Sequence, residues 1–523
     1  MPEAVQVMES YCPQFILKQA RAMTGLKQHL HESGYQLGPA RIMTARREIY
    51  DTFDWRLFNN RLLLGHDPDG DATLFLFNVA DSVLISQAKT AAVARFFHEL
   101  DSAAIASRLA PVIEERALIC QGSFVLRMEQ RDISDDHEKI IARLFVERLA
   151  KQAAADNKTG RPLRVVRIQA LKGYERKTKK IFSRISGYCN GSSSPSTLLA
   201  AYFSALGRTP GDYSSKLLVQ LDQSMTIRQA LSAILLSQLD MMERNTPGCR
   251  DDIDTEFLHD FRIANRRSRS LVTGMKGVLP APTYESGRQF FSWLSKQTSA
   301  LRDIDVFLLA FRQYEQLLPD KMYAQLLPLQ KFLQQRKETE RKGLTSALDS
   351  DRFRGFIRSW RAALQESSGE ENTTGPVLDT AEAAIWRAWK RVRKHGRHAA
   401  KSGSDEALHE LRISCKKLRY LLEAFRTLFL AKDVEQAIRQ LRRLQNVLGD
   451  IVDFQVQQQY LSQWQENFPG KQHRGVKTAM DFLGEVYARR ENATKKEFQR
   501  HYHAFVSVGN RALFKSLCGK TNA

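Results

Sequence analysis

Two short segments of the chain place a histidine and several cations at the same spacing. The first is His259-Asp-Phe-Arg-Ile-Ala-Asn-Arg-Arg-Ser-Arg269, and the second is His409-Glu-Leu-Arg-Ile-Ser-Cys-Lys-Lys-Leu-Arg419. In both, cations follow the histidine at +3, +7, +8 and +10, and the two copies lie 150 residues apart. Guanidinium and ammonium groups at this density can bind the oxygens of a multivalent anion.

Both segments predict an amphipathic helix whose charged stripe lies beside an apolar one. Positions 0, +3, +7 and +10 share one face at 3.6 residues per turn, so the histidine and three of the cations are aligned. Each helix should therefore bury one face and present cations beside it. The apolar stripe begins one residue earlier and comprises Leu408, Leu411, Cys415, Leu418 and Leu422 in the second copy, and Leu258, Phe261, Asn265, Ser268 and Val272 in the first.

Two interpretations of the charged stripes are open. A charged helix face is commonly only solvated. Like charges at i, i+3 and i, i+4 repel by about 0.2–0.5 kcal/mol per pair, however, and neither stripe contains an acid that would relieve the repulsion. A bound multivalent anion would relieve it, so the pattern and its repetition favour anion binding.

A third basic segment, residues 386–401, contains no acid and leads directly into the second histidine helix. Its Trp386 and Trp389 are interpreted as core residues rather than as platforms for stacked bases, and the basic run Lys177-Thr-Lys-Lys180 is interpreted as solvated. The residues predicted to bind the anion are His259, Arg262, Arg266, Arg267, Arg269, Lys390, Arg393, Lys394, Arg397, His409, Arg412, Lys416, Lys417 and Arg419.

The two histidines have competing interpretations. The favoured role is structural, with the ring hydrogen-bonded beside the helix start, and a hydrogen bond to phosphate is the next choice. Metal binding is not expected, because neither helix supplies a second ligand at a suitable spacing. Asp303 and Asp450 are expected to pair with the cations rather than to act as catalytic acids. No catalytic residue, metal site or cofactor is predicted.

The helices that must position these side chains are expected after residue 215, where the period is helical throughout. Gly, Pro and Ser punctuate the chain at 190–196 and 366–376 and indicate linkers. Long helices joined by short loops form antiparallel bundles, so we expect two four-helix bundles, at 216–365 and 377–510. The eight expected helices are 224–245, 254–277, 284–317, 320–349, 378–402, 405–430, 433–466 and 472–507.

The first 190 residues mix strand and helix periods, which predicts an α+β domain. Leu62-Leu-Leu64 and Thr73-Leu-Phe-Leu-Phe77 are strand-like runs on either side of a turn, and 163–171 is a further strand. Helical patterns are expected at 15–30 and 90–108. Residues 191–215 are expected to be a linker to the helical domain.

The charge of the chain is uneven. Its 523 residues carry 79 Lys and Arg against 58 Asp and Glu, a net charge of +21. Residues 1–150 are slightly acidic, with 17 cations and 20 acids, whereas 216–523 hold 50 cations and 35 acids. This surplus implies a polyanionic partner, namely a polyphosphate, a nucleic acid or an anionic membrane surface, and places its site in the helical part.

The cysteines and the apolar runs narrow the class of protein further. The 6 cysteines are scattered without a CxxC pair, which disfavours zinc ribbons and fits a reducing cytoplasm. The N-terminus has no signal-peptide pattern, and apolar runs such as 230–236 are too short for a transmembrane helix. We therefore expect a cytoplasmic protein without membrane insertion.

The helical part resembles the CHAD family. The resemblance covers about 218–510 and rests on the two His-x-x-Arg segments, on Leu301-Arg-Asp-Ile-Asp305 and on Leu444-Gln-Asn-Val-Leu-Gly-Asp450. It implies two pseudo-symmetric four-helix bundles whose basic faces bind inorganic polyphosphate, and association with polyphosphate granules.

The N-terminal part resembles a degenerate CYTH domain, the triphosphate tunnel fold. Ile49-Tyr-Asp-Thr52 with Asp54 is similar to a segment of that family, and Leu171-Lys-Gly-Tyr-Glu175 is similar to the junction with CHAD. Active members begin with a Glu-x-Glu-x-Lys strand, whereas this chain has Glu3-Ala-Val-Gln-Val7. The resemblance therefore implies a barrel without catalysis.

The leading hypothesis is a non-enzymatic polyphosphate-binding protein. The alternatives are a CYTH-type inorganic triphosphatase and a nucleic-acid-binding protein, although the chain lacks a recognisable nucleic-acid-reading module. Protein partners, oligomeric state and chain-length preference are not predicted.

Overall fold

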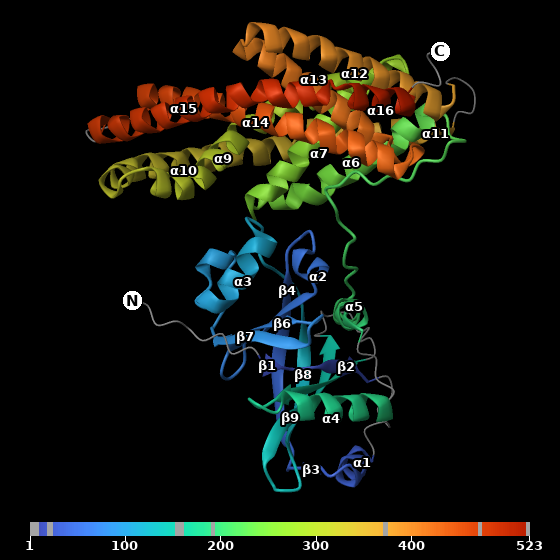
Figure 1. The fold of residues 1–523 in the computed structure, drawn as a ribbon, viewed down its shortest axis with the longest axis vertical. Helices are drawn as coiled ribbons and strands as arrows, with labels where there is room; N and C mark the ends of the chain where they lie inside the picture. Colours follow the sequence, from blue (N-terminus) through green and yellow to red (C-terminus); the bar gives the residue numbers. More distant parts are fainter. Residues whose placement is uncertain are drawn as a thin grey trace. The chain divides into compact units, whose positions relative to one another are not determined.

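The structure is a computed structural model that describes residues 10–17, 25–151, 162–189, 194–369, 375–468 and 473–518. The chain divides into two units, Met1–Ser215 and Lys216–Ala523. The N-terminal unit contains the antiparallel sheet and the second unit is helical (Figure 1). The predicted order of an α+β region followed by an all-α region is confirmed. The segment Glu3 to Val7 lies outside the described residues.

The sheet of the N-terminal unit is antiparallel and curved. Its hydrogen-bonded order is β1-β7-β6-β5-β4-β8-β9-β10-β2, with β3 beside β8. Because β1 and β2 adjoin in the chain yet pair with strands at opposite ends of this order, the sheet must bend toward closure. The strands are β1 Ser10–Tyr11, β2 Gln14–Ile16, β3 Gln36–Leu37, β4 Arg41–Asp51, β5 Leu62–Asp67, β6 Thr73–Asn78, β7 Val83–Lys89, β8 Ile119–Ser134, β9 Ile140–Lys151 and β10 Leu163–Ala170.

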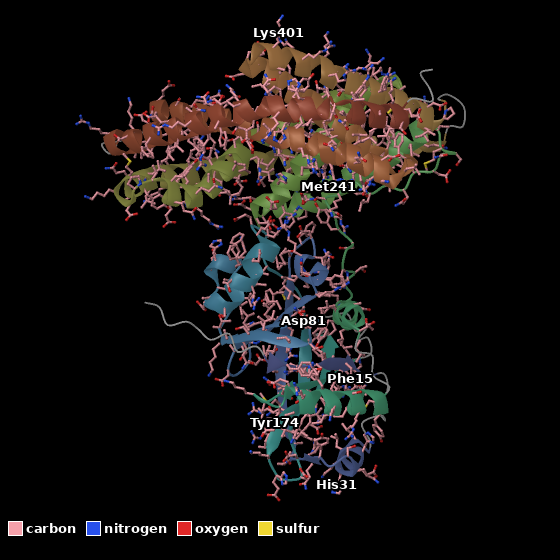
Figure 2. All side chains as sticks on the ribbon, viewed as in Figure 1. Phe15, His31, Asp81, Tyr174, Met241 and Lys401 are labelled. Atoms are coloured by element: carbon pink, nitrogen blue, oxygen red, sulfur yellow. The ribbon has the colours of Figure 1, made fainter. Side chains whose placement is uncertain are left out.

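Helices cover the sheet at several points. Phe15 of β2 packs in one core cluster with Tyr174 at its margin (Figure 2). The helix expected at 15–30 is wrong at its start, because Phe15 pairs with Val166 in the sheet. The helices of this unit are α1 Leu26–Glu32, α2 Arg56–Asn59, the 3-10 turn η2 Phe97–Glu99, α3 Ala103–Ile113, α4 Glu175–Tyr188 and α5 Pro195–Ala205.

The segment expected to be a linker, 191–215, differs in the structure. Its middle forms α5, whose Leu198, Leu199, Tyr202 and Phe203 are buried in the core of the N-terminal unit. These four residues recur on one helix face, and burial of that face stabilises the helix. The segment therefore belongs to the N-terminal unit.

The second unit consists of long helices. Helices α11 and α16 were not predicted. The expected helix 284–317 is divided into α8 and α9 at Thr298. The helices are α6 Ile227–Arg250, α7 Thr255–Gly274, α8 Ala281–Gln297, α9 Ser299–Leu317, α10 Asp320–Leu348, α11 Asp351–Gly369, α12 Val377–Ser402, α13 Asp405–Ala424, the turn η3 Arg426–Leu428, α14 Ala431–Asn467, α15 His473–Phe505 and α16 Val508–Cys518.

The element bounds repeat with the same offset as the sequence motif. Helices α6 and α12 begin at Ile227 and Val377, and α7 and α13 span Thr255–Gly274 and Asp405–Ala424. The pair α8–α9 and the single helix α14 also start and end 150 residues apart. This agreement supports the interpretation of the helical unit as a duplication.

The two halves are joined by a common core. The ends of α9 and α10 from the first half pack against α14 and α15 from the second, around Phe307, Phe311, Tyr314, Trp464 and Tyr487. The ring of Phe307 meets that of Trp464 edge-on, with centroids 4.1 Å apart. This aromatic core fixes the two halves relative to each other and, with them, the helices that carry the basic stripes.

Helices α6 and α7 approach each other closely at the start of α7. A Cβ atom on Gly248 of α6 would lie 2.2 Å from the ring of Phe257 in α7. We therefore expect Gly248→Ala to lower the free energy of unfolding by about 1–3 kcal/mol through overpacking. Gly343→Ala in α10, where a Cβ would meet nothing within 4 Å, should instead be neutral or stabilise by up to about 1 kcal/mol. Urea denaturation followed by helical circular dichroism measures both, and equal destabilisation would contradict the prediction.

Candidate functional site

Helices α7 and α13 carry the two basic stripes and begin at well-formed caps. Asp254 accepts backbone bonds from Glu256 and Phe257 at the start of α7, and Ser404 caps α13 through the backbone N–H of Ala407. Such caps satisfy amide donors that would otherwise lack partners. Both expected apolar stripes are buried, including the polar Asn265, whose amide donates to the backbone oxygen of Phe291 and to Ser295 Oγ.

The two stripes face each other. Helices α7 and α13 are in contact, and the positive charge of Arg266 on α7 acts on both Arg412 and Lys416 of α13. The charge of Arg266 also acts on Arg262 of its own helix. The structure thus brings together Arg262, Arg266, Arg412 and Lys416, and we call these four residues the central cluster.

The central cluster is short of negative charge. Burial, followed by the charges of Arg412 and Arg266, lowers the pKa of Lys416 to about 7. Burial and Arg266 likewise lower the pKa of Arg262. Burial disfavours the charged form of a lysine, and neighbouring cations add to this effect. The cluster is therefore suited to bind an anion that supplies the missing charge.

The hydrogen bonds of the cluster leave donors available. Arg262 donates to Thr298 Oγ1 at 2.8 Å, and Arg412 donates to the exposed carboxylate of Asp453 at 3.2 Å. The Nε atom of Arg266 is buried and, among the described residues, has no hydrogen-bond partner. Since a buried unsatisfied donor costs free energy, a ligand oxygen that reached this atom would be favoured.

Beside Arg262 the site continues toward α9 and α14. Tyr460 donates a hydrogen bond to Asp303, and the charges of Arg262 and Arg336 act on Tyr460. Asp303, Arg336 and Tyr460 border a cavity of about 160 Å³ that Ile304 and Trp464 also line. Asp303 was expected to pair with the cations; in the structure its carboxylate accepts a hydrogen bond from Tyr460, and its charge acts on Arg262.

The two histidines have different surroundings. Nδ1 of His259 lies 3.0 Å from a guanidinium nitrogen of Arg302. Because a guanidinium can only donate, this ring nitrogen must accept. His259 therefore orients Arg302, which also donates to the backbone oxygen of Thr255. His409, at the corresponding place on α13, is exposed.

The remaining predicted cations on α7 and α13 lie beside the central cluster. Arg267 is buried and lies 3.6 Å from Glu423, which also pairs with Arg419 at 3.7 Å. Arg269 is exposed, and its charge acts on Lys417 together with that of Arg391 on α12. The predicted set therefore extends along both helices but includes three members that already have a carboxylate partner, namely Arg267, Arg412 and Arg419.

The four predicted cations of α12 do not join the central cluster. Lys390 and Arg393 lie over the rings of Trp386 and Trp389, at 5.4 and 4.8 Å. The charges of Arg393 and Arg397 act on Tyr502 of α15, and Lys394 is exposed. The contacts of these residues run along α12 and to α15 rather than to the facing stripes.

Several residues of the site were not predicted. Arg302 lies in the Leu301-Arg-Asp-Ile-Asp305 motif, and its place beside two aspartates could have indicated that it belongs to the site. Asp453 lies 150 residues after Asp303, so the offset of the repeat was a signal for it. Tyr460 and Arg336 come from α14 and α10 and carry no local pattern that would connect them with α7.

Comparison with known protein families identifies a match in the helical part. Residues 233–462 match the family model of the CHAD domain. Among curated proteins, Uncharacterized protein Rv2226 of Mycobacterium tuberculosis is 26% identical over 222 residues, which are 40% of this chain and 40% of that protein. The chain thus matches less than half the length of this curated relative.

Among solved structures, a crystal structure of the CHAD domain from the plant Ricinus communis has 24% identity to this chain. The match has a TM-score of 0.49 and covers 56% of this chain and 96% of that one. Within the described residues, none of the helices has the length and apolar character needed to span a membrane.

The depressed pKa of Lys416 can be measured directly. We expect an NMR titration of ε-¹³C-labelled lysine to give an apparent pKa of about 7 for Lys416. Arg266→Gln removes a neighbouring positive charge and should raise this pKa. Lys390→Gln on α12 makes the same change of net charge elsewhere and should leave it in place. An unshifted Lys416 pKa in the Arg266→Gln variant would show that the two stripes are not electrostatically coupled.

Proposed function

We propose that this protein binds inorganic polyphosphate through the facing basic stripes of α7 and α13. Residues 233–462 match the family model of the CHAD domain, which is a type of binding domain associated with polyphosphate. The observation that carries the proposal is the central cluster, in which Arg262, Arg266, Arg412 and Lys416 lie together. We propose that the binding domain extends over residues 216–510.

The chemistry of the cluster suits a phosphate polymer. Each interior phosphate carries a negative charge and presents two free oxygens, which a guanidinium can contact through paired N–H donors. Consecutive phosphates would place such charges along the stripe at short intervals. Release of counterions from the polymer would add to the affinity and make it depend on salt, as it does for DNA.

A nucleic acid is the second polyanion to consider. The facing stripes offer cations, but the aromatic side chains near them, Tyr460 and Trp464, are paired or buried in the shared core. Single-stranded nucleic acids are normally bound through aromatic side chains on which bases stack. The absence of such a platform from the described part of the stripes favours polyphosphate.

The N-terminal unit has the antiparallel half-barrel compatible with a CYTH-like domain, but its interior charges are already paired. Arg47 makes a two-bond contact with Asp67 at 2.7 and 2.8 Å and a bond of 2.7 Å to Glu147. Arg167 donates to the same Glu147 at 3.0 Å. Burial alone would raise the pKa of Glu147, yet the two guanidinium groups hold it below its ordinary value.

This pairing does not fit the divalent metal that the tunnel fold implies. A metal site needs clustered carboxylates that are free to bind, whereas the central carboxylate of the barrel is held by two arginines. The described residues contain no group of three or more His, Cys, Asp or Glu side chains placed to hold a metal ion. We propose that the protein is not a triphosphatase and that it acts by binding, at polyphosphate granules in the cytoplasm.

Neutralising the central cluster tests the binding site. We expect Arg266→Gln with Lys416→Gln to weaken binding of long-chain polyphosphate by at least about tenfold and to make the slope of log affinity against log salt shallower by roughly 1.5. The fold should survive, because the change removes repulsion between like charges. The matched control is Lys390→Gln with Lys394→Gln on α12, which removes the same charge at exposed positions. Fluorescence anisotropy with labelled polymer measures both, and an equal loss in the control would show diffuse surface binding instead.

The titration of Lys416 gives the binding a pH dependence. A polyanion beside Lys416 favours its charged form and raises its pKa from about 7. Binding therefore takes up a proton in weakly alkaline solution, so affinity should fall as the pH rises from about 6 to about 9. Lys416→Arg keeps the charge at every pH in this range and should flatten the profile. The prediction fails if the two proteins give the same profile with long-chain polymer.

A further inference from the structure

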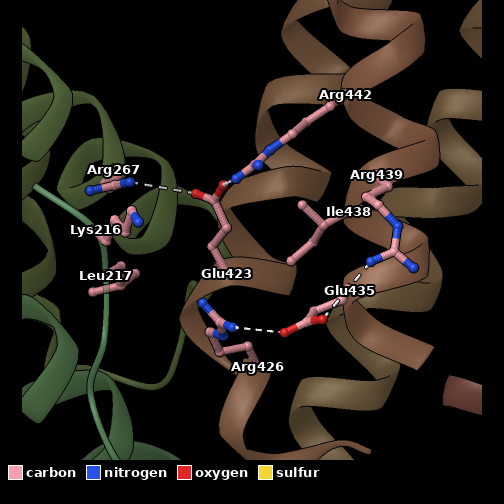
Figure 3. A pocket seen from close by; sticks show the side chains of 9 residues that line it. All are labelled: Lys216, Leu217, Arg267, Glu423, Arg426, Glu435, Ile438, Arg439 and Arg442. Carbon is pink, nitrogen blue, oxygen red and sulfur yellow. Dashed lines mark hydrogen bonds and ion pairs between the residues drawn. The ribbon is translucent and has the colours of Figure 1, made fainter. Parts of the chain in front are cut away.

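A polar pocket of about 300 Å³ lies at the end of α13, next to the basic stripe (Figure 3). It is formed where the first residues of the helical unit pass the corner between α13 and α14. The backbone N–H of Leu221 donates to Thr427 Oγ1, and this hydroxyl donates to the backbone oxygen of Val219, which holds that segment in place. The pocket is lined by Lys216, Leu217, Arg267, Glu423, Arg426, Glu435, Ile438, Arg439 and Arg442.

Cations outnumber acids around this pocket. Figure 3 shows the carboxylate of Glu423 between Arg267 and Arg442, and Glu435 between Arg426 and Arg439. Lys216 adds a fifth cation to these four arginines. The lining therefore carries a surplus of positive charge that the two glutamates do not balance.

The ion pairs in the pocket are loose. The closest nitrogen–oxygen distances are 3.5 Å for Arg442 with Glu423, 3.4 Å for Arg426 with Glu435 and 3.9 Å for Arg439 with Glu435. Elsewhere in this chain Arg288 binds Glu285 through two bonds of 2.9 and 2.6 Å. Charge-assisted hydrogen bonds of full strength have the shorter lengths. Arg426, Arg439 and Arg442 thus retain donors that a stronger acceptor could use.

The pocket is continuous with the basic stripe. Arg412, Lys416, Arg419 and Glu423 follow one another on α13 at spacings of three or four residues, so they share one face of this helix. Glu423 lines the pocket together with Arg426 of η3, which follows the end of α13. Arg419 lies 3.7 Å from Glu423, and its Nε atom is buried without a hydrogen-bond partner among the described residues. A polymer that follows the stripe would therefore reach the pocket.

We propose that this pocket binds the terminal phosphate group of a polyphosphate chain. The inference rests on the proposed function, since it assigns the pocket to the same ligand. A terminal phosphate differs from an interior one because it has three free oxygens and takes a second negative charge near neutral pH. Loosely paired guanidinium groups around a cationic pocket match both properties, whereas the open stripe suits interior phosphates. Free orthophosphate and pyrophosphate share this chemistry.

The test uses the full-length protein, with inorganic pyrophosphate and long-chain polyphosphate as probes. The variant is Arg439→Gln with Arg442→Gln, whose side chains are 60% and 58% exposed and can be changed without disturbing the core. The matched control is Arg489→Gln with Arg500→Gln on α15, which makes the same change of charge at side chains that are 81% and 75% exposed. The polymer is supplied with free ends and with both ends capped by an amine through a phosphoramidate bond.

We expect calorimetry to show saturable pyrophosphate binding by the wild type and the control, weakened at least about tenfold in the pocket variant. Free-ended polymer should bind the wild type more tightly than capped polymer, and this difference should disappear in the pocket variant. Equal pyrophosphate binding by wild type and pocket variant would overturn the inference. So would pyrophosphate binding that depends on the pocket while capped and free ends bind alike, because the pocket would then hold only free small phosphates. If the wild type bound neither the free-ended nor the capped long polymer, the proposed function itself would be overturned.

Discussion

The packing of α7 against α13 holds like charges together, and the other features of the helical unit depend on this arrangement. Apolar stripes on both helices are buried, and burial at about 25 cal/mol per Å² supplies the free energy that keeps Arg266, Arg412 and Lys416 near one another. The cost of this proximity is visible in Lys416, which burial and its neighbours bring to a pKa of about 7. The fold thus holds like charges close together at one surface. A bound anion whose negative charges matched their spacing would reduce the repulsion.

The duplication makes the two halves of this surface similar, and sequence differences between the halves make its two ends different. Arg302 and Asp303 near α7 correspond to Val452 and Asp453 near α13. On the first side a histidine orients an arginine and a tyrosine binds the aspartate. On the second side Arg412 reaches an exposed aspartate, and Glu423 stands where the first half has Thr273. The two ends of the basic surface are therefore chemically distinct, although the helices that carry them are equivalent.

Much of this arrangement could be predicted from the sequence. The spacing of His259 and His409 with their cations identified both helices and the offset between copies, because a helix period is a local property. Phe353, Ile357 and Trp360 also recur on one face and could have indicated α11. Partners such as Arg336 and Tyr460 could not be found in this way, since only tertiary packing brings α10 and α14 to the site. The position of the four cations of α12 could not be predicted for the same reason. Their density is visible in the sequence, but the face on which they lie is set by packing against α15.

The aromatic core shared by the two halves bears on how such a chain could arise. Phe307, Phe311 and Tyr314 from the first half complete their packing only against Trp464 and Tyr487 from the second. A half-length protein would expose these rings to water and could bury them only against a second copy of itself. A primitive form of this unit would accordingly have been a homodimer with a two-fold axis between its copies of the histidine helix. Fusion of two such copies would keep the subunit interface as an internal core and let each half diverge, which a symmetric dimer cannot do.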